Sequence, residues 1–175
     1  MNGMGTSASF INLVDFVLTP DESIGFVIHM NGIRRVNMSS LHVTMFAGSF
    51  AGFLDGPATS AQFDSLSGGA VSPDGTYMLL CDRSSHRIRK ITLTVPYTVS
   101  TLVGDGVAGS VDGPGILARL TSPKSIDISS NGLKAVVGSM NKVRIIDLQS
   151  LMVTTLMNTS SMVMDVVIRS DSRCD

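Results

Sequence analysis

The chain has 175 residues, of which 15% are charged, and its formal net charge is −1. This length can bury a sizeable core, and a net charge so close to zero gives no field that would draw the whole chain to nucleic acid or anionic lipid. The apolar stretch from Phe10 to Leu18 is broken by Asp15 and is too short to cross a bilayer, so the sequence predicts no membrane span.

Tight-turn sequences recur along the chain. They lie at residues 19–22, 72–75, 129–132 and 169–172, and they follow apolar runs at 14–18, 69–71, 125–128 and 165–168. Pro, Asp, Asn and Gly favour the backbone angles of tight turns. Each apolar run is therefore predicted to be a strand that enters a hairpin.

Three more β-rich runs follow each of the first three turns. The second strands are predicted at 25–28, 77–81 and 134–137, the third at 33–36, 88–91 and 143–146, and the fourth at 43–47, 99–103 and 153–157. The third strand carries an apolar-Arg signature that recurs at steps of 55 residues, from Ile33 to Ile88 and from Ile88 to Val143. Four antiparallel strands thus make one unit, and the sequence predicts about thirteen strands and no helix longer than one turn.

The segments between units repeat as well. Ala51 to Pro57 matches Ala108 to Pro114 at an offset of 57 residues. Four-stranded units of roughly 40 to 55 residues are typical of propeller blades. The predicted fold is all-β, a partial β-propeller of four-stranded antiparallel blades. Its expected parts are blade 1 at 8–48, a linker at 49–62, blade 2 at 63–104, a linker at 105–119, blade 3 at 120–158, and the first strand of an incomplete blade 4 at 162–175.

The second unit and the linker after it carry the longest motif: Ser72-Pro-Asp-Gly, then Cys81-Asp-Arg-Ser-Ser-His-Arg-Ile-Arg-Lys-Ile91, then Asp112-Gly-Pro-Gly in the linker. This pattern resembles NHL repeats, and the likeness extends over nearly the whole chain. The first unit lacks the Asp and has a loop two residues shorter, and the third has Gly138 to Asn141 where Asp82 to His86 would fall. The resemblance implies a propeller that docks proteins, or in some members single-stranded RNA or carbohydrate. A minority of similar propellers are metal-dependent lyases or lactonases.

Catalytic chemistry has little support in the residues. A metal site in a propeller needs several His, Glu or Asp side chains that converge on one place. The chain has three histidines, His29, His42 and His86, and one glutamate, Glu22, and no two of them are predicted to share a blade position. We predict no catalytic residue, no metal site and no cofactor, and we expect that the protein is not an enzyme. A metal-dependent lyase or lactonase is the remotest alternative.

Five charged residues are interpreted as structural because they recur from unit to unit. A residue found in every blade is expected to support the fold. The guanidinium of a recurring Arg can bridge two segments, or its aliphatic stem can cover apolar surface. These positions are Arg34, Arg89, Arg144, Asp55 and Asp112. The alternative is a basic stripe for RNA, which would need Arg87, Lys90 and Lys142 exposed together beside a stacking aromatic ring.

A docking face is predicted from strand direction. In an antiparallel blade, the loop between the second and third strands lies at the same end as the interblade linkers, and variable loops on a rigid scaffold carry recognition. The candidate interaction residues are Phe50, Phe53, Asp82, Arg83, His86, Asp105, Asp112, Asn141 and Lys142. At the opposite end, the turn from Thr94 to Tyr97 is one residue longer than its counterparts, which makes Tyr97 a further candidate contact.

Ring closure requires partners. Propellers have four to eight blades, so three blades are expected to be a segment of a larger protein or to associate with other copies. A protein partner is expected, with an RNA or a small polar ligand as the alternative. Low charge and the NHL resemblance favour an extracytoplasmic part of a larger protein, although the compartment stays open.

Overall fold

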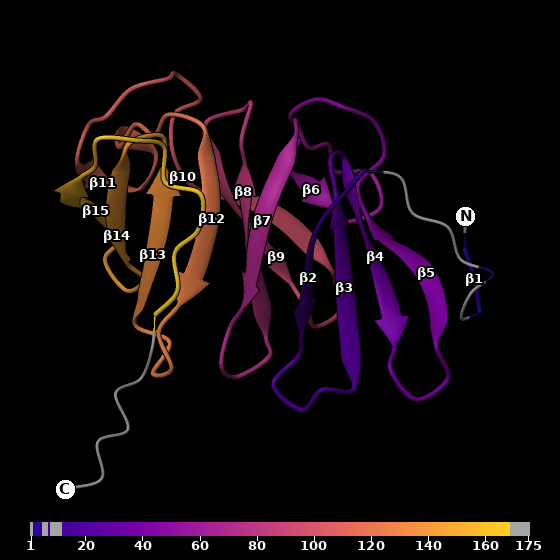
Figure 1. Ribbon diagram of the computed structural model, residues 1–175. Coiled ribbons are helices and arrows are strands. Elements are labelled where there is room, and N and C mark those ends of the chain that lie inside the picture. The colour runs from indigo at the N-terminus through magenta and orange to yellow at the C-terminus, as the bar shows by residue number, and fades with distance from the viewer. Residues whose placement is uncertain (1, 5–6, 8–11, 169–175) are drawn as a thin grey trace, which may run out of the picture.

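The computed structural model describes residues 2–4, 7 and 12–168, and it consists of three antiparallel sheets (Figure 1). Blade 1 contains β1 (Gly3–Met4), β2 (Leu13–Leu18), β3 (Ile24–His29), β4 (Gly32–Asn37) and β5 (His42–Ala47). Blade 2 contains β6 (Gly56–Pro57), β7 (Leu66–Val71), β8 (Tyr77–Asp82), β9 (Arg87–Thr92) and β10 (Thr98–Val103). Blade 3 contains β11 (Gly113–Pro114), β12 (Pro123–Ile128), β13 (Lys134–Ser139), β14 (Lys142–Asp147) and β15 (Met152–Asn158).

The four long strands of each blade follow the predicted order, so the all-β fold with antiparallel blades is confirmed; each sheet also has a short fifth strand. Residues 14–157, all of which the structure describes, contain a single helical segment, the 3₁₀ turn Gly115–Leu117. This agrees with the prediction that no helix is longer than one turn. No helix in the described part of the chain has the length and hydropathy needed to cross a membrane.

The three hairpins between the first and second strands of each blade share one pattern of side-chain hydrogen bonds. In blade 2, Ser72 Oγ donates to Asp74 Oδ1 at 2.6 Å and accepts from Tyr77 N at 3.1 Å. Gly75 then takes a φ of +70°, which an L side chain rarely adopts. Blade 3 repeats this with Ser129 and Asn131, and blade 1 does so with Thr19 and Asp21. The turn chemistry read from the sequence therefore sets the strand register.

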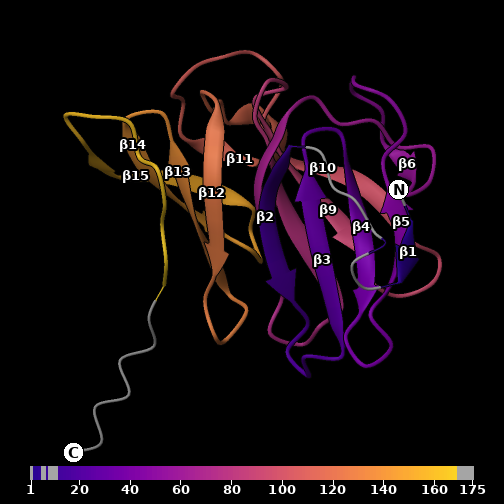
Figure 2. The ribbon, with the colours of Figure 1, turned by 45° about the vertical axis from the view of Figure 1, so that its right-hand side comes forward.

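The blades pack face to face (Figure 2). Two layers of buried apolar side chains lie between them. Blade 2 is buried on both faces, because successive residues of β8 point to opposite sides of its sheet: Leu80 enters one layer and Leu79 the other. The layer between blades 1 and 2 includes Ile28, Ile33, Phe63, Met78 and Leu80. The layer between blades 2 and 3 includes Leu79, Cys81, Ile88, Leu120 and Val137.

A fifth, two-residue strand lies at the outer edge of every sheet, and the sequence did not reveal it. Gly56 pairs with Val99, Gly113 with Val153, and Gly3 with Val43. Gly56 and Gly113 belong to the linkers, so each linker adds its strand to the blade that follows it. The three equivalent pairs show one register in all three blades.

Residues 162–168 form no strand, contrary to the expected first strand of a fourth blade; residues 169–175 of that expected strand lie outside the described residues. Val163 N donates to Met140 O at 2.6 Å, much as Leu66 N donates to Met30 O at 2.7 Å in blade 2. The segment thus follows the path of an innermost strand beside blade 3. It lacks a ladder because no second strand of a fourth blade lies beside it among the described residues.

Candidate functional site

The blades present two unlike faces. The loops that join the second and third strands lie at one end together with both interblade linkers, at the top of Figure 1, and we call this end the linker face. The tight turns that join first to second and third to fourth strands lie at the opposite end, which we call the hairpin face.

The side chain of Arg89 lies beneath the linker face and is 0% exposed. Its Nε and Nη2 donate to Asp55 Oδ1, at 3.1 and 2.5 Å, and its Nη1 donates to Asp82 Oδ2 at 2.8 Å. Two further bonds go to the carbonyls of Gln62 and Leu54. All five guanidinium N–H groups therefore have acceptors, and Arg89 ties the linker to blade 2.

Blade 3 repeats this arrangement with a change. Arg144 is also buried, and it donates to Asp112 Oδ1 at 2.6 Å and to the carbonyls of Val111 and Arg119. Ser139 stands where blade 2 has Asp82: its Oγ accepts from Thr121 N and donates to Thr121 O. In blade 1 the matching residue of the second strand is His29, which pairs with Leu13 as Asp82 pairs with Leu66.

Asp82 itself lies beneath the surface of the linker face, with 0% exposure. Burial raises the pKa of Asp82, and the hydrogen bonds from Asp64 N and Arg89 act in the opposite direction. Its carboxylate therefore holds the loop from Asp64 in place and does not face a partner.

His29 is expected to stay neutral in the folded protein until the pH falls below 6.5, its ordinary pKa. Burial lowers the pKa of His29, and the nearby positive charge of Arg34 lowers it further. Because the folded protein then binds fewer protons than the unfolded chain, stability is expected to fall as the pH drops below 6.5. A ¹H–¹³C NMR titration checks this, with His29→Gln to assign the signal. A midpoint at or above 6.5 would contradict it.

A hollow of about 310 Å³ opens between the two linkers, lined by Phe53, Asp55, Arg87, Thr101, Gly104, Asp105 and Ile116. The guanidinium of Arg87 lies over the ring of Phe53 at 3.9 Å and donates to the carbonyls of Ser85 and Asp105. Phe53 comes from the first linker and Ile116 from the second, so the hollow exists only where both linkers meet.

Large apolar side chains are exposed along both linkers. Phe50 is 77% exposed, and the others are Phe53, Leu54, Val107, Val111, Ile116 and Leu117. Exposed apolar residues gathered on one surface mark interaction sites more often than scattered ones do. The sequence had singled out only the two phenylalanines among them.

The other predicted interaction residues have varied surroundings. Arg83 and Asn141 are exposed. His86 Nδ1 accepts from Ser122 N at 3.1 Å, and Asp105 forms an ion pair with Arg119 at 2.7 Å. Lys142 Nζ donates to Asn158 Oδ1, and Asp112 holds Arg144 and Thr155. Most of these polar side chains thus have partners within the fold.

The basic residues considered for RNA binding are not brought together. Lys90 Nζ lies 4.3 Å from the ring centre of Tyr77, which begins β8 next to a hairpin turn. Lys142 begins β14 at the linker end, and the Arg87 guanidinium donates to two carbonyls. These placements do not form the exposed stripe that a nucleic acid would need.

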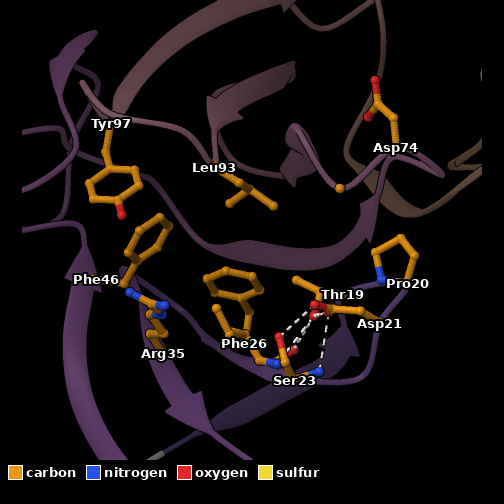
Figure 3. A pocket seen from close by; sticks show the side chains of 12 residues that line it. Thr19, Pro20, Asp21, Ser23, Phe26, Arg35, Phe46, Asp74, Leu93 and Tyr97 are labelled. Carbon is orange, nitrogen blue, oxygen red and sulfur yellow. Dashed lines mark hydrogen bonds between the residues drawn. The ribbon is translucent and has the colours of Figure 1, made fainter.

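The hairpin face carries a second pocket, of about 330 Å³, between blades 1 and 2 (Figure 3). Figure 3 shows Arg35, Phe46 and Tyr97 at one end and Thr19, Asp21 and Ser23 at the other, with Phe26 and Leu93 between them. Tyr97 thus lies in a pocket, on the face opposite the linkers. Ile24, Pro20, Asp74 and Gly75 complete the lining.

No group of three or more His, Cys, Asp or Glu side chains suited to a metal ion occurs among the described residues. No family model and no curated protein matches the sequence.

Solved structures do match in fold. Hydrazine synthase of Kuenenia stuttgartiensis superposes with a TM-score of 0.65 and 16% identity, over 88% of this chain and 38% of that one. An auxiliary nutrient binding protein of Bacteroides thetaiotaomicron superposes with a TM-score of 0.63 and 19% identity, over 79% of this chain and 35% of that one. U3-55K superposes with a TM-score of 0.64 and 16% identity, over 90% of this chain and 43% of that one. The chain spans less than half the length of each of these proteins, and the likeness shows that the fold is that of a β-propeller.

Proposed function

We propose that the chain is an NHL-type propeller segment that binds a protein partner through its linker face. The observation that carries this proposal is the set of exposed apolar side chains on both linkers, two of which, Phe53 and Ile116, line one hollow. Aromatic and apolar anchors that enter a hollow dominate the energy of protein interfaces. The partner suited to it offers an apolar side chain to the hollow.

The local charges support a protein partner over a phosphate-rich one. Asp105 and Asp55 lie at the hollow, and their carboxylates are paired with Arg119 and Arg89. The Arg87 guanidinium is held by carbonyls, with its face against Phe53. The hollow therefore offers apolar surface with its charges already compensated, as protein interface cores do.

Within the described residues, blades 1 and 3 each have a neighbouring blade on one side only, because blade 2 lies between them (Figure 1). Within this proposal, further blades of a longer chain, or a second copy, pack against those sheets and complete a ring. The linker face then becomes one sector of a circular docking surface.

We expect the immobilised double variant Phe50→Ser, Ile116→Ser to capture at least about tenfold less partner than the unchanged chain, because it lacks two apolar anchors. Both side chains are strongly exposed, so folding should be unaffected, which circular dichroism checks. Quantitative mass spectrometry of the captured proteins gives the readout.

The matched control is Val95→Ser on the hairpin face, where Val95 is 79% exposed. We expect it to capture the same partner as the unchanged chain. Retained capture by the double variant, or loss of capture by Val95→Ser, would assign the partner to another surface.

A further inference from the structure

We propose that the hairpin-face pocket is a binding site for a short zwitterionic peptide, one with a free carboxylate, a free ammonium group and an apolar side chain. This site is separate from the linker face and does not depend on the function proposed above. The pocket lies between blades 1 and 2, and both blades contribute side chains to it.

One end of the pocket offers hydrogen-bond donors that have no acceptor in the part of the chain that the structure describes. The guanidinium of Arg35 makes no hydrogen bond or ion pair with any described residue, and neither does the hydroxyl of Tyr97. Arg89, one strand position away from the matching site in blade 2, has all five N–H groups bonded. A guanidinium left open beside a phenol matches a carboxylate, because its planar fork can donate to both oxygens.

The middle of the pocket is apolar. The rings of Phe26 and Phe46 are 5.0 Å apart between centroids, and Phe46 lies 5.2 Å from the ring of Tyr97 in an edge-on contact. Leu93 and Ile24 extend this surface. Such a floor suits an aromatic or large aliphatic side chain.

The other end carries negative charge. Asp21 and Asp74 lie in neighbouring hairpin turns, and hydroxyl and N–H groups of their own turns hydrogen-bond to both carboxylates. These bonds lower the pKa of each, so both are ionised at neutral pH. Neither forms an ion pair with a described Lys or Arg. An ammonium group is the ligand feature that complements them.

The matching space between blades 2 and 3 lacks these properties. Register places Lys90 opposite Leu79 where blade 1 has Arg35 opposite Phe26. Lys90 lies over Tyr77, and the space there is about 210 Å³. The larger pocket falls in the range of about 300–1,000 Å³ that small ligands occupy. The pocket is thus a feature of one blade junction and not of the repeat.

Isothermal titration of the chain with Gly-Phe tests this proposal. We expect Gly-Phe to bind, its C-terminal amide to bind at least about tenfold more weakly, and its N-acetyl form about threefold more weakly, since each lacks one charge. A longer peptide ending in Phe tests whether the site takes a protein C-terminus or a free dipeptide. Its ammonium group cannot reach Asp21, so we expect its affinity to equal that of the N-acetyl form.

Variants complete the test. Arg35→Gln should weaken Gly-Phe binding by at least about tenfold and Tyr97→Phe by about two- to fivefold, while Lys90→Gln leaves it unchanged. Arg35 and the Tyr97 hydroxyl have no hydrogen-bond or ion-pair partner to lose among the described residues, so these variants should fold. The proposal is overturned if Gly-Phe gives no binding at about 10 mM, if the amide or the N-acetyl form binds as well, or if Arg35→Gln binds like the unchanged chain.

Discussion

Replacing Arg89 with methionine is expected to lower the free energy of unfolding by about 3–5 kcal/mol. Methionine fills a similar volume but leaves the carboxylate of Asp82 without its cation at a site that is 0% exposed. It also leaves the carbonyls of Gln62 and Leu54 and the carboxylate of Asp55 without their guanidinium donor. Urea denaturation followed by circular dichroism measures the change.

Two further variants identify the cause. Arg89→Met combined with Asp82→Leu removes both charges and should recover part of the loss, because the uncompensated carboxylate is gone. Lys90→Met changes the adjacent, half-exposed residue and should alter stability by less than about 1 kcal/mol. If Arg89→Met were as stable as Lys90→Met, the guanidinium would not be what joins the linker to blade 2.

Gly104→Ala is expected to lower the free energy of unfolding by about 2–4 kcal/mol, from backbone strain together with steric overlap. Gly104 has a φ of +100°, and a Cβ there would lie 2.6 Å from the carbonyl oxygen of His86. Backbone atoms cannot move aside as a flexible side chain could. Thermal and urea unfolding give the measurement.

Gly56→Ala is the matched control for that substitution. Gly56 also has a positive φ, of +134°, but a Cβ there would meet no atom within 4 Å. Gly56→Ala should lower the free energy of unfolding only through backbone strain, by about 1–2 kcal/mol. Equal losses for the two variants would mean that the close approach to His86 is unimportant.

The repeated turns made most of the architecture predictable. Ser72, Asp74 and Gly75, with their counterparts in the other units, fix where each hairpin begins, and the 55-residue step from Ile33 to Ile88 fixes the third strand. The two-residue edge strands were missed because Gly56-Pro57 has neither β-propensity nor alternation. Only its hydrogen-bonding partner, Thr98 to Val99, makes it a strand.

The candidate sites were less accessible to sequence reasoning. Phe53 could be singled out, but its neighbour Ile116 in the hollow is more than sixty residues away along the chain. His29 could not be matched to Asp82 because the following loop differs in length, and strand pairing establishes the match. The hairpin-face pocket arises where Arg35 of one blade meets Tyr97 of the next, and no local pattern predicts that meeting.

The crossing of each linker onto the next blade has a consequence for recombination between propellers. Asp55 and Gly56 precede β7 in the chain, yet they bind Arg89 and Val99 of blade 2. A chimera joined at Phe63 would combine the Arg89 of one parent with the Asp55 of another. A junction placed before Ala51 would carry a blade together with its own carboxylate and edge strand. The transferable module of this fold therefore begins about fifteen residues before its first long strand, at Ala51 for β7, which begins at Leu66.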